Sequence, residues 1–242
     1  MAPEVSGLRY AARRTILTDM GFLDDLKRQA DALQAQQSTD TAALERNTQL
    51  ADAGCKTAFT YLDTLVRQLQ VLKPVSKVRY ELDKKTRFEQ LPITQLKVDA
   101  RRKMLRGTEL YDHIVLHARL NDGRRLNLVK DFLPDIEKLE SRLRFGGTPV
   151  HARPVRNPDN GKLLEMRYEF QVDFVLAARI TPDHDRGRIG FRLQNFDGFE
   201  TVEFELPATE LGSARLDELA RWLLGEPHRF LDGAQALKRT EA

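Results

Sequence analysis

The sequence predicts an α+β protein in which a helical hairpin of coiled-coil type precedes a mostly antiparallel β-sheet or open barrel with two short helices. Three observations predict this class. Before Pro74, apolar residues recur at alternating steps of three and four. After Pro74, they alternate with polar residues, and turns rich in Gly, Pro, Asn and Asp separate the alternating runs. We expect two domains, residues 1–75 and residues 76–242.

The amino-terminal region is predicted to form two helices joined by a short polar connection. Residues 19–37 place apolar positions three and four apart, and residues 40–73 do the same. Residues 38–40 offer N-cap side chains to the second helix, and Pro74 ends it. Because a connection as short as QQSTD favours antiparallel neighbours, we expect a hairpin.

A heptad seam runs along the second helix from Leu44 to Leu72, with Thr48 as its only polar member. The single cysteine, Cys55, lies in this seam, where a buried thiol behaves as a small apolar residue. No histidine precedes His113, so a catalytic cysteine is not favoured. A two-helix hairpin leaves one flank open, and we expect the β region or a second chain to cover it. The predicted interaction seam comprises Leu44, Ala51, Cys55, Ala58, Leu62, Leu65 and Leu69.

The residues after Pro74 have the pattern of strands. Residues 78–83 alternate between apolar and charged side chains. Within residues 109–132, NDGR separates two alternating runs, and Asp122-Gly123 supplies the turn chemistry of a tight hairpin. Further strands are predicted for residues 149–156, 163–180, 188–196 and 200–207, with turn-forming residues between them.

The strand at 163–180 is long, and its apolar residues change parity between Phe174 and Val175, which predicts a β-bulge. Two short amphipathic helices complete the prediction. The first begins near Pro134 and ends at Gly146-Gly147, and the second covers residues 213–225. Their inward faces are predicted to carry Ile136, Leu139 and Leu143 in the first helix, and Leu216, Leu219, Ala220 and Leu223 in the second.

The composition is that of a soluble globular protein. Of 242 residues, 41% are apolar and 31% are charged with mixed signs, which disfavours a disordered or fibrous chain. No run approaches the roughly 20 apolar residues of a membrane span, and the start lacks the apolar core of a secretory signal. One cysteine cannot form an internal disulfide framework. We therefore expect a cytoplasmic protein without a membrane partner.

Charge is distributed unevenly along the chain. Residues 76–156 carry 19 Lys and Arg against 11 Asp and Glu, whereas residues 157–242 carry 11 against 16. Arginine forks bind phosphate and carboxylate groups, so the basic cluster indicates an anion, a nucleotide or a nucleic acid as a ligand. A solvated surface, or pairing with the acidic end of the chain, is the alternative. The candidate binding residues are Arg101, Arg102, Lys103, Arg106, Arg124 and Arg125.

Arg102 and Arg106 form an RxxxR ahead of a β-rich region. This pair resembles the first half of the cyclic-di-GMP motif of PilZ domains. The second half of that motif, D/N-x-S-x-x-G, does not occur downstream. Membership of the family is therefore not inferred.

The candidates for catalysis or metal binding are few. His113 and His117 lie in a predicted strand, where four residues span some 13 Å, too far for one metal ion. Residues 183–185 (Asp-His-Asp) fall in a predicted turn and are expected to be solvated. No nucleotide-binding or hydrolase motif is present. We expect no catalytic residues, metal site or cofactor.

These observations leave three functional hypotheses. The favoured one is a non-enzymatic interaction or assembly protein, an adaptor whose helical hairpin binds a protein partner or a second copy of the chain. The second is binding of an anion, a nucleotide or a nucleic acid through the arginine-rich patch. The third is a hydrolase with its site in the mouth of the barrel.

Overall fold

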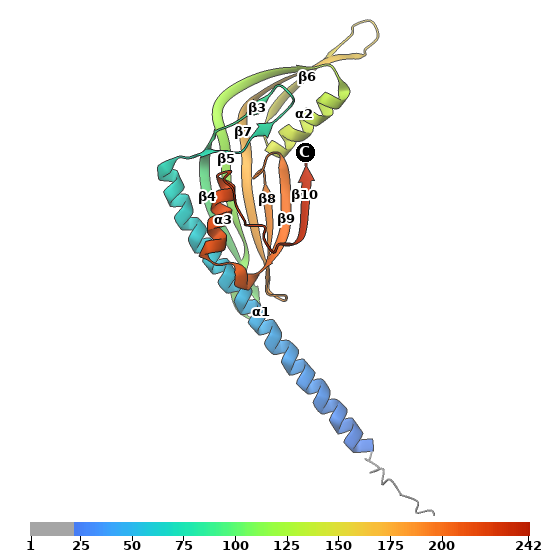
Figure 1. Cartoon of the computed structure of the whole chain (residues 1–242). Coiled ribbons are helices and arrows are strands. Elements are labelled where there is room, and N and C mark those ends of the chain that lie inside the picture. Colours follow the sequence, from blue (N-terminus) through green and yellow to red (C-terminus); the bar gives the residue numbers. More distant parts are fainter. Residues whose placement is uncertain (1–21) are drawn as a thin grey trace, which may run out of the picture. The chain divides into compact units, whose positions relative to one another are not determined.

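The computed structural model describes residues 22–242, so the predicted helix start at residues 19–21 and the chain before it lie outside the described residues. The chain divides into one unit that ends at Ala43 and another that spans Leu44–Ala242. The α+β class is confirmed, because a long helix precedes a curled antiparallel sheet and a few short helices (Figure 1). The predicted domain division at residues 75 and 76 stays a prediction.

One continuous helix, α1 (Phe22–Leu72), occupies the region predicted to be a hairpin, so the prediction of a hairpin is wrong. The hydroxyls of Ser38 and Thr39 both donate to the Ala35 carbonyl at 2.9 Å, and Gln36 Nε2 donates to Asp40 Oδ1 at 2.9 Å. The polar residues expected to cap a second helix thus bond within the turns of the first. Nothing in QQSTD forces a break, because it contains neither Pro nor Gly.

The strands form one eight-stranded antiparallel sheet in the order β1-β4-β5-β7-β8-β9-β10, with β6 paired to β7. A separate pair joins β2 (Tyr80–Glu81) to β3 (Arg87–Phe88). β6 and β8 pair with opposite ends of the same edge of β7, whereas β5 follows its other edge. The sheet strands are β1 (Val75–Ser76), β4 (Leu91–Leu105), β5 (Thr108–Lys130), β6 (Val150–Arg156), β7 (Leu163–Asp183), β8 (Arg188–Gln194), β9 (Glu200–Pro207) and β10 (Gln235–Glu241).

The NDGR sequence does not form the predicted hairpin, because β5 continues through it as one strand. Asn121 pairs with Asp173 and Arg125 with Gln171, so three residues of β5 lie opposite one residue of β7. The side chain of Asn121 accepts from the Gly123 amide at 2.7 Å, and Gly123 takes a φ of 78°. The turn chemistry is therefore used for a bulge inside a long strand. A two-residue turn at residues 106–107 joins β4 to β5 instead.

The bulge predicted at Phe174 and Val175 is also wrong. Even-numbered residues of β7 are buried from Tyr168 through Pro182, so the strand keeps one parity there. Val175 and Ala177 are half-buried on the opposite face, which explains the apparent change of phase in the sequence. In the pairing of β5 with β7, the bulge lies on β5, between Asn121 and Arg125.

The remaining predicted elements agree with the structure to different degrees. The predicted strands at 149–156, 188–196 and 200–207 correspond to β6, β8 and β9, whereas the strand at 78–83 is reduced to the two residues of β2. β4 and β10 were not predicted. Both short helices are confirmed, as α2 (Leu133–Gly146) and α3 (Ser213–Leu223), and a 3-10 turn, η1 (Ala208–Glu210), precedes α3.

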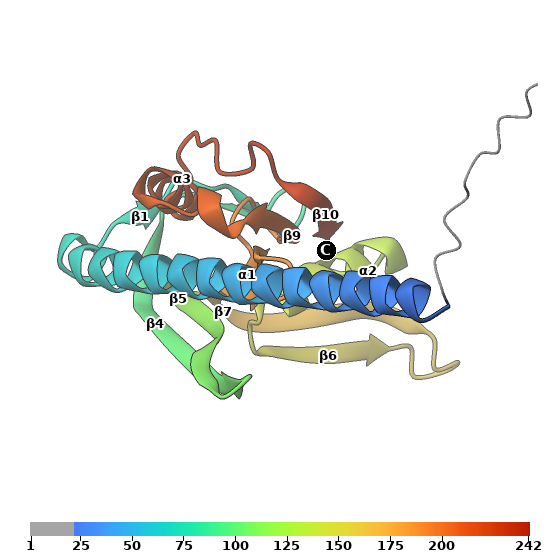
Figure 2. The ribbon, with the colours of Figure 1, turned by 90° about the horizontal axis from the view of Figure 1, so that it is seen from below.

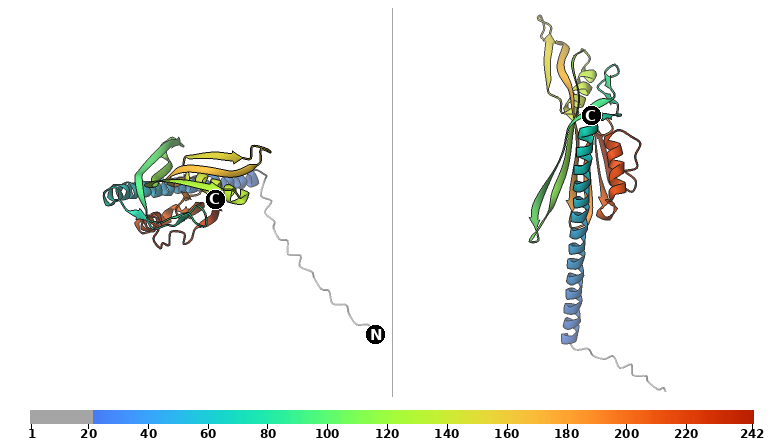
Figure 3. Two further views of the ribbon diagram at one scale, coloured as in Figure 1. Left: turned by 90° about the horizontal axis from the view of Figure 1, so that it is seen from above. Right: turned by 90° about the vertical axis from the view of Figure 1, so that its left-hand side faces the viewer.

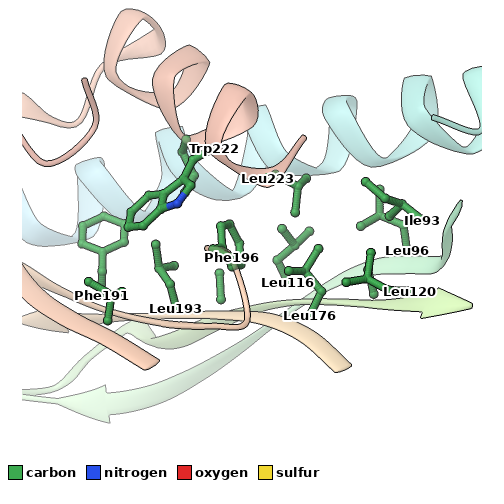
Figure 4. Close-up of a cluster of buried hydrophobic side chains, with 14 of the residues drawn as sticks. Ile93, Leu96, Leu116, Leu120, Leu176, Phe191, Leu193, Phe196, Trp222 and Leu223 are labelled. Carbon is green, nitrogen blue, oxygen red and sulfur yellow. The ribbon is translucent and has the colours of Figure 1, made fainter. Parts of the chain in front are cut away.

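Within Leu44–Ala242, the helices cover one face of the curled sheet. From Leu44 onward α1 crosses the open side of the curl with α3 beside it, and α2 covers the end formed by β5, β6 and β7 (Figures 2 and 3). Leu116, Leu176 and Leu193 of the strands point toward Trp222 and Leu223 of α3 (Figure 4). This core lies between the helices and the sheet, and the other face of the sheet carries mostly polar side chains.

Among the described residues, no helix is long and apolar enough to cross a membrane.

Candidate functional site

The amino-terminal part of α1, residues 22–43, carries a row of exposed leucines that we call the leucine stripe. Leu23, Leu26 and Leu33 have exposed fractions of 78%, 44% and 64%, and Ala30 lies between the last two. Steps of three and four place all four side chains on one face of the helix. An apolar row at heptad spacing is the pattern by which one helix packs against another.

The positions that flank the leucine stripe carry little charge. In a heptad with Leu23 and Leu26 at its apolar positions, the flanking residues are Lys27, Gln29, Gln34 and Gln36. The acidic residues between Leu23 and Leu33, which are Asp24, Asp25 and Asp31, fall on the far side of the helix. A helix that lies against the stripe therefore meets neutral amides and one lysine.

The leucine stripe ends before the chain reaches its second unit. Gln37 and Asp40 take the next two heptad positions after Leu33, and the Asp40 carboxylate accepts a hydrogen bond from Gln36. These polar side chains limit the apolar contact to about two heptads, roughly 16 Å of helix from Leu23 to Leu33.

The predicted interaction seam on the later part of α1 lies against the chain's own sheet. Ala51, Cys55, Ala58, Leu62 and Leu69 are buried in the main core. The two remaining members of the seam are less enclosed, since Leu65 is half-buried and Leu44 is 36% exposed. The sequence predicted that either the β region or a second chain covers this seam, and in the described structure the β region covers it.

Polar contacts also fix this part of α1 to the strands. The Asp52 carboxylate accepts from the Tyr111 amide at 2.9 Å, and Gln70 Nε2 donates to the Leu96 carbonyl at 2.8 Å. Gly54 permits close approach, because a Cβ there would lie 2.8 Å from Ile189 Cδ1. The helix is therefore held along both the β4–β5 side and the β8 side of the sheet.

Cys55 has the environment of a structural thiol. It is fully buried, and burial together with the nearby Asp52 carboxylate raises its pKa to about 12. A thiol with so high a pKa carries almost no thiolate at neutral pH, so it is a poor nucleophile. The interpretation of Cys55 as a core residue agrees with this geometry.

The basic residues of the β4–β5 turn are paired with acidic groups of the same chain. Arg102 lies 3.7 Å from the Glu109 carboxylate, with its guanidinium 4.6 Å from the Tyr111 ring centroid. Lys103 Nζ lies 3.1 Å from an oxygen of Asp112. Arg106 pairs with the Asp185 carboxylate and donates to Thr48 Oγ1 at 2.8 Å.

The six predicted cations do not gather at one place. Arg101 pairs across the strands with His113, whereas Arg125 lies beyond the bulge of β5, opposite Gln171 of β7. Gln171 is nine residues from Ile180, the partner of Ile114, which is roughly 30 Å along an extended strand. Arg124 bonds to Asp122, and its guanidinium lies 5.4 Å from the Phe88 ring centroid. Binding of an anion by this set stays a prediction, although four members already have acidic partners within the fold.

His184, expected in a solvated turn, is buried. Its Nε2 lies 2.8 Å from the Tyr111 carbonyl, which ties the loop after β7 to β5. Its neighbour Asp185 binds Arg106, and the Asp185 carbonyl accepts from Asn47 Nδ2 of α1 at 2.7 Å. This loop therefore joins α1 to the sheet. Sequence periodicity gave no signal for that role, because turns follow no repeating pattern.

Within residues 22–242, no group of three or more His, Cys, Asp or Glu side chains could hold a metal ion.

The hydrolase hypothesis expects a site in the mouth of the curled sheet. From Leu44 onward α1 crosses this mouth together with α3, and the side chains between these helices and the strands are apolar (Figure 4). The hypothesis stays a prediction, with no described residue that carries it.

No protein-family model matches the chain, and neither a curated protein nor a solved structure matches it.

Proposed function

We propose that this chain is a non-enzymatic assembly protein that associates with a second copy of itself through the leucine stripe. The observation that carries the proposal is the exposure of Leu23, Leu26 and Leu33 on one face of α1. Isolated exposed leucines are ordinary, but a row of them at heptad spacing on one helix face favours a helical partner. The folded sheet unit is then the part that each copy brings to the assembly.

The flanking residues favour a second copy over an unrelated partner. Helices that select a different partner commonly use opposite charges at the flanking positions. Here those positions hold Gln29, Gln34 and Gln36, with Lys27 as the one charge. Two identical helices therefore meet without repulsion between rows of like charge. Ala30, at the middle of the stripe, lets two helices approach closely.

The expected association is weak. Burying a leucine side chain contributes at least about 1.5 kcal/mol, so the six leucines of two copies contribute about 9 kcal/mol. Association costs at least about 4 kcal/mol in lost translational and rotational freedom. The remaining 5 kcal/mol or so corresponds to a dissociation constant of about 0.2 mM. The dimer therefore forms only at high protein concentration.

Sedimentation velocity over a range of protein concentrations tests the proposal. We expect the wild-type sedimentation coefficient to rise with concentration, and the double variant Leu26→Asp/Leu33→Asp to stay monomeric, because two carboxylates would then be buried in the contact. Leu72→Asp is the matched control. Leu72 is 72% exposed on the same helix but outside the stripe, so this variant should associate as the wild type does.

A wild-type protein that remains monomeric at several hundred micromolar would contradict self-association. Equal loss of association in the double variant and in Leu72→Asp would show that the contact lies elsewhere. Circular dichroism and the thermal midpoint of each dilute variant confirm that the sheet unit is intact.

A further inference from the structure

A second surface lies on the sheet face opposite the helices, where β5, β7 and β6 run side by side. Residues paired directly across antiparallel strands point to the same face. Tyr168 and Phe170 of β7 are buried toward α2, so the odd-numbered residues of this part of β7 lie on the outer face. The outer face therefore presents Gln171, Glu169 and Arg167 in successive rows. Figure 3 shows the end of the sheet where β6 lies beside β7.

Two arginines stand opposite each other on this face. Arg153 of β6 pairs directly with Arg167 of β7, and both are exposed. Arg167 Nε donates to Glu165 Oε1 at 2.7 Å, whereas Arg153 forms no ion pair with a described residue. Like charges directly opposite each other on a sheet are destabilising. An anion bound between the two guanidinium groups would remove that repulsion.

Shallow hollows join this arginine pair to a third arginine. One hollow, of about 230 Å³, is bordered by Arg153, Arg167 and His151. The other, of about 290 Å³, is bordered by His151 and Arg125. Glu169 borders both hollows, and Asp173, whose carboxylate pairs with Arg119, borders the hollow at Arg125. The rows of Arg167 and Arg125 lie four residues apart on β7, roughly 13 Å, so the joined hollows are long enough for an extended ligand.

The side chains of this face fit phosphate groups better than bases. Guanidinium forks bind phosphate oxygens two at a time. Binding to bases would need exposed aromatic rings for stacking. The nearby aromatic residues Tyr168 and Phe170 are buried on the other face of the sheet. Val129 and Asn127 are the β5 residues in the rows of Arg167 and Glu169, and neither can stack.

We propose that Arg153, Arg167 and Arg125 form a binding site for a chain of phosphate groups on the outer face of β5, β7 and β6. The phosphates come either from a free oligophosphate or from the backbone of a nucleic-acid duplex. Glu169 opposes the ligand and limits its affinity. The site differs from the basic segment at residues 101–106 and does not depend on self-association through α1.

Two probes test the site and distinguish the two sources. Sodium tripolyphosphate is titrated by calorimetry, and a fluorescent 20-base-pair DNA duplex is titrated by anisotropy at low and moderate salt. We expect Arg153→Ala and Arg167→Ala to weaken binding about tenfold each, the loss of one charge-assisted contact. Glu169→Gln should strengthen binding several-fold. Arg46→Ala is the matched control, because it removes the same charge from an exposed position on α1, outside both sets of candidate binding residues, and should change affinity less than about twofold.

The outcomes separate cleanly. Binding of tripolyphosphate alone assigns a free oligophosphate, whereas binding of the duplex with the same response to substitution assigns a nucleic-acid backbone. Binding of neither probe by the wild type overturns the proposal. An equal loss in Arg46→Ala also overturns it, because net charge alone would then explain the binding. Without ligand, Arg153→Ala should leave the thermal midpoint unchanged or raise it, since it removes a like-charge pair.

Discussion

Replacing Leu62 tests whether the later part of α1 belongs to the core of the sheet unit. Leu62 is 1% exposed and lies in the same buried cluster as Leu116 and Trp222. Removing most of a buried leucine costs the transfer of the lost atoms and leaves a cavity, together about 2–5 kcal/mol. We expect Leu62→Ala to lower the free energy of unfolding by an amount in this range. If α1 were a detached helix, the same change would cost only a small fraction of this.

Urea denaturation, followed by the fluorescence of Trp222, measures this cost. Trp222 of α3 is the single tryptophan and is fully buried in the same core as Leu62, so its emission reports on that core. Leu72→Ala is the control, because Leu72 is 72% exposed on the same helix and its loss should cost less than about 0.5 kcal/mol. A Leu62→Ala variant no less stable than Leu72→Ala would refute the placement of α1 in the core.

Two further predictions concern the same helix. Gly54→Leu should lower the free energy of unfolding by about 1–3 kcal/mol, because a Cβ added at Gly54 would already lie 2.8 Å from Ile189 Cδ1 and 3.2 Å from the Ala208 carbonyl oxygen. Ala53→Leu, at an exposed position, should be neutral in the same urea titration. Burial raises the pKa of Cys55 from 9.0 to about 12, so folding favours the protonated thiol, and this stabilisation is present below pH 9 and is lost as the pH rises toward 12. Urea titrations at pH 8 and about pH 10.5 measure this loss. Between these pH values the free energy of unfolding of the wild type should fall by about 2 kcal/mol more than that of Cys55→Ala. Equal losses would show that the thiol titrates normally.

The sequence predicted much of the secondary structure because local patterns determine it. α2 is marked by Pro134 at its start and Gly147 at its end, and its buried residues follow the helical period. The alternation in β8 and β9 is equally local. The Asp122-Gly123 turn was recognised as a turn, but whether it closes a hairpin or forms a bulge depends on β7, which lies some fifty residues farther along the chain.

The partners of the predicted faces could not be read from the sequence. The heptad seam correctly indicated that Cys55 and Leu62 are buried, but an apolar helical row packs equally well on a sheet or on another helix. Nor could the arginine pair be found by inspection of the chain. Arg153 and Arg167 are separated by fourteen residues, and only the register of β6 on β7 makes them neighbours.

Thiol labelling distinguishes the two parts of α1, of which the later part is packed in the core and the earlier part is proposed to bind a second copy. A bulky maleimide is applied to the variants Leu26→Cys and Arg28→Cys at low and high protein concentration, with Cys55 as the internal reference. We expect slow labelling of Cys55 throughout, fast labelling at position 28 throughout, and labelling at position 26 that is fast when dilute and slow when concentrated. Labelling at position 26 that does not change with concentration would rule out association through the leucine stripe, and rapid labelling of Cys55 would rule out its burial in the core.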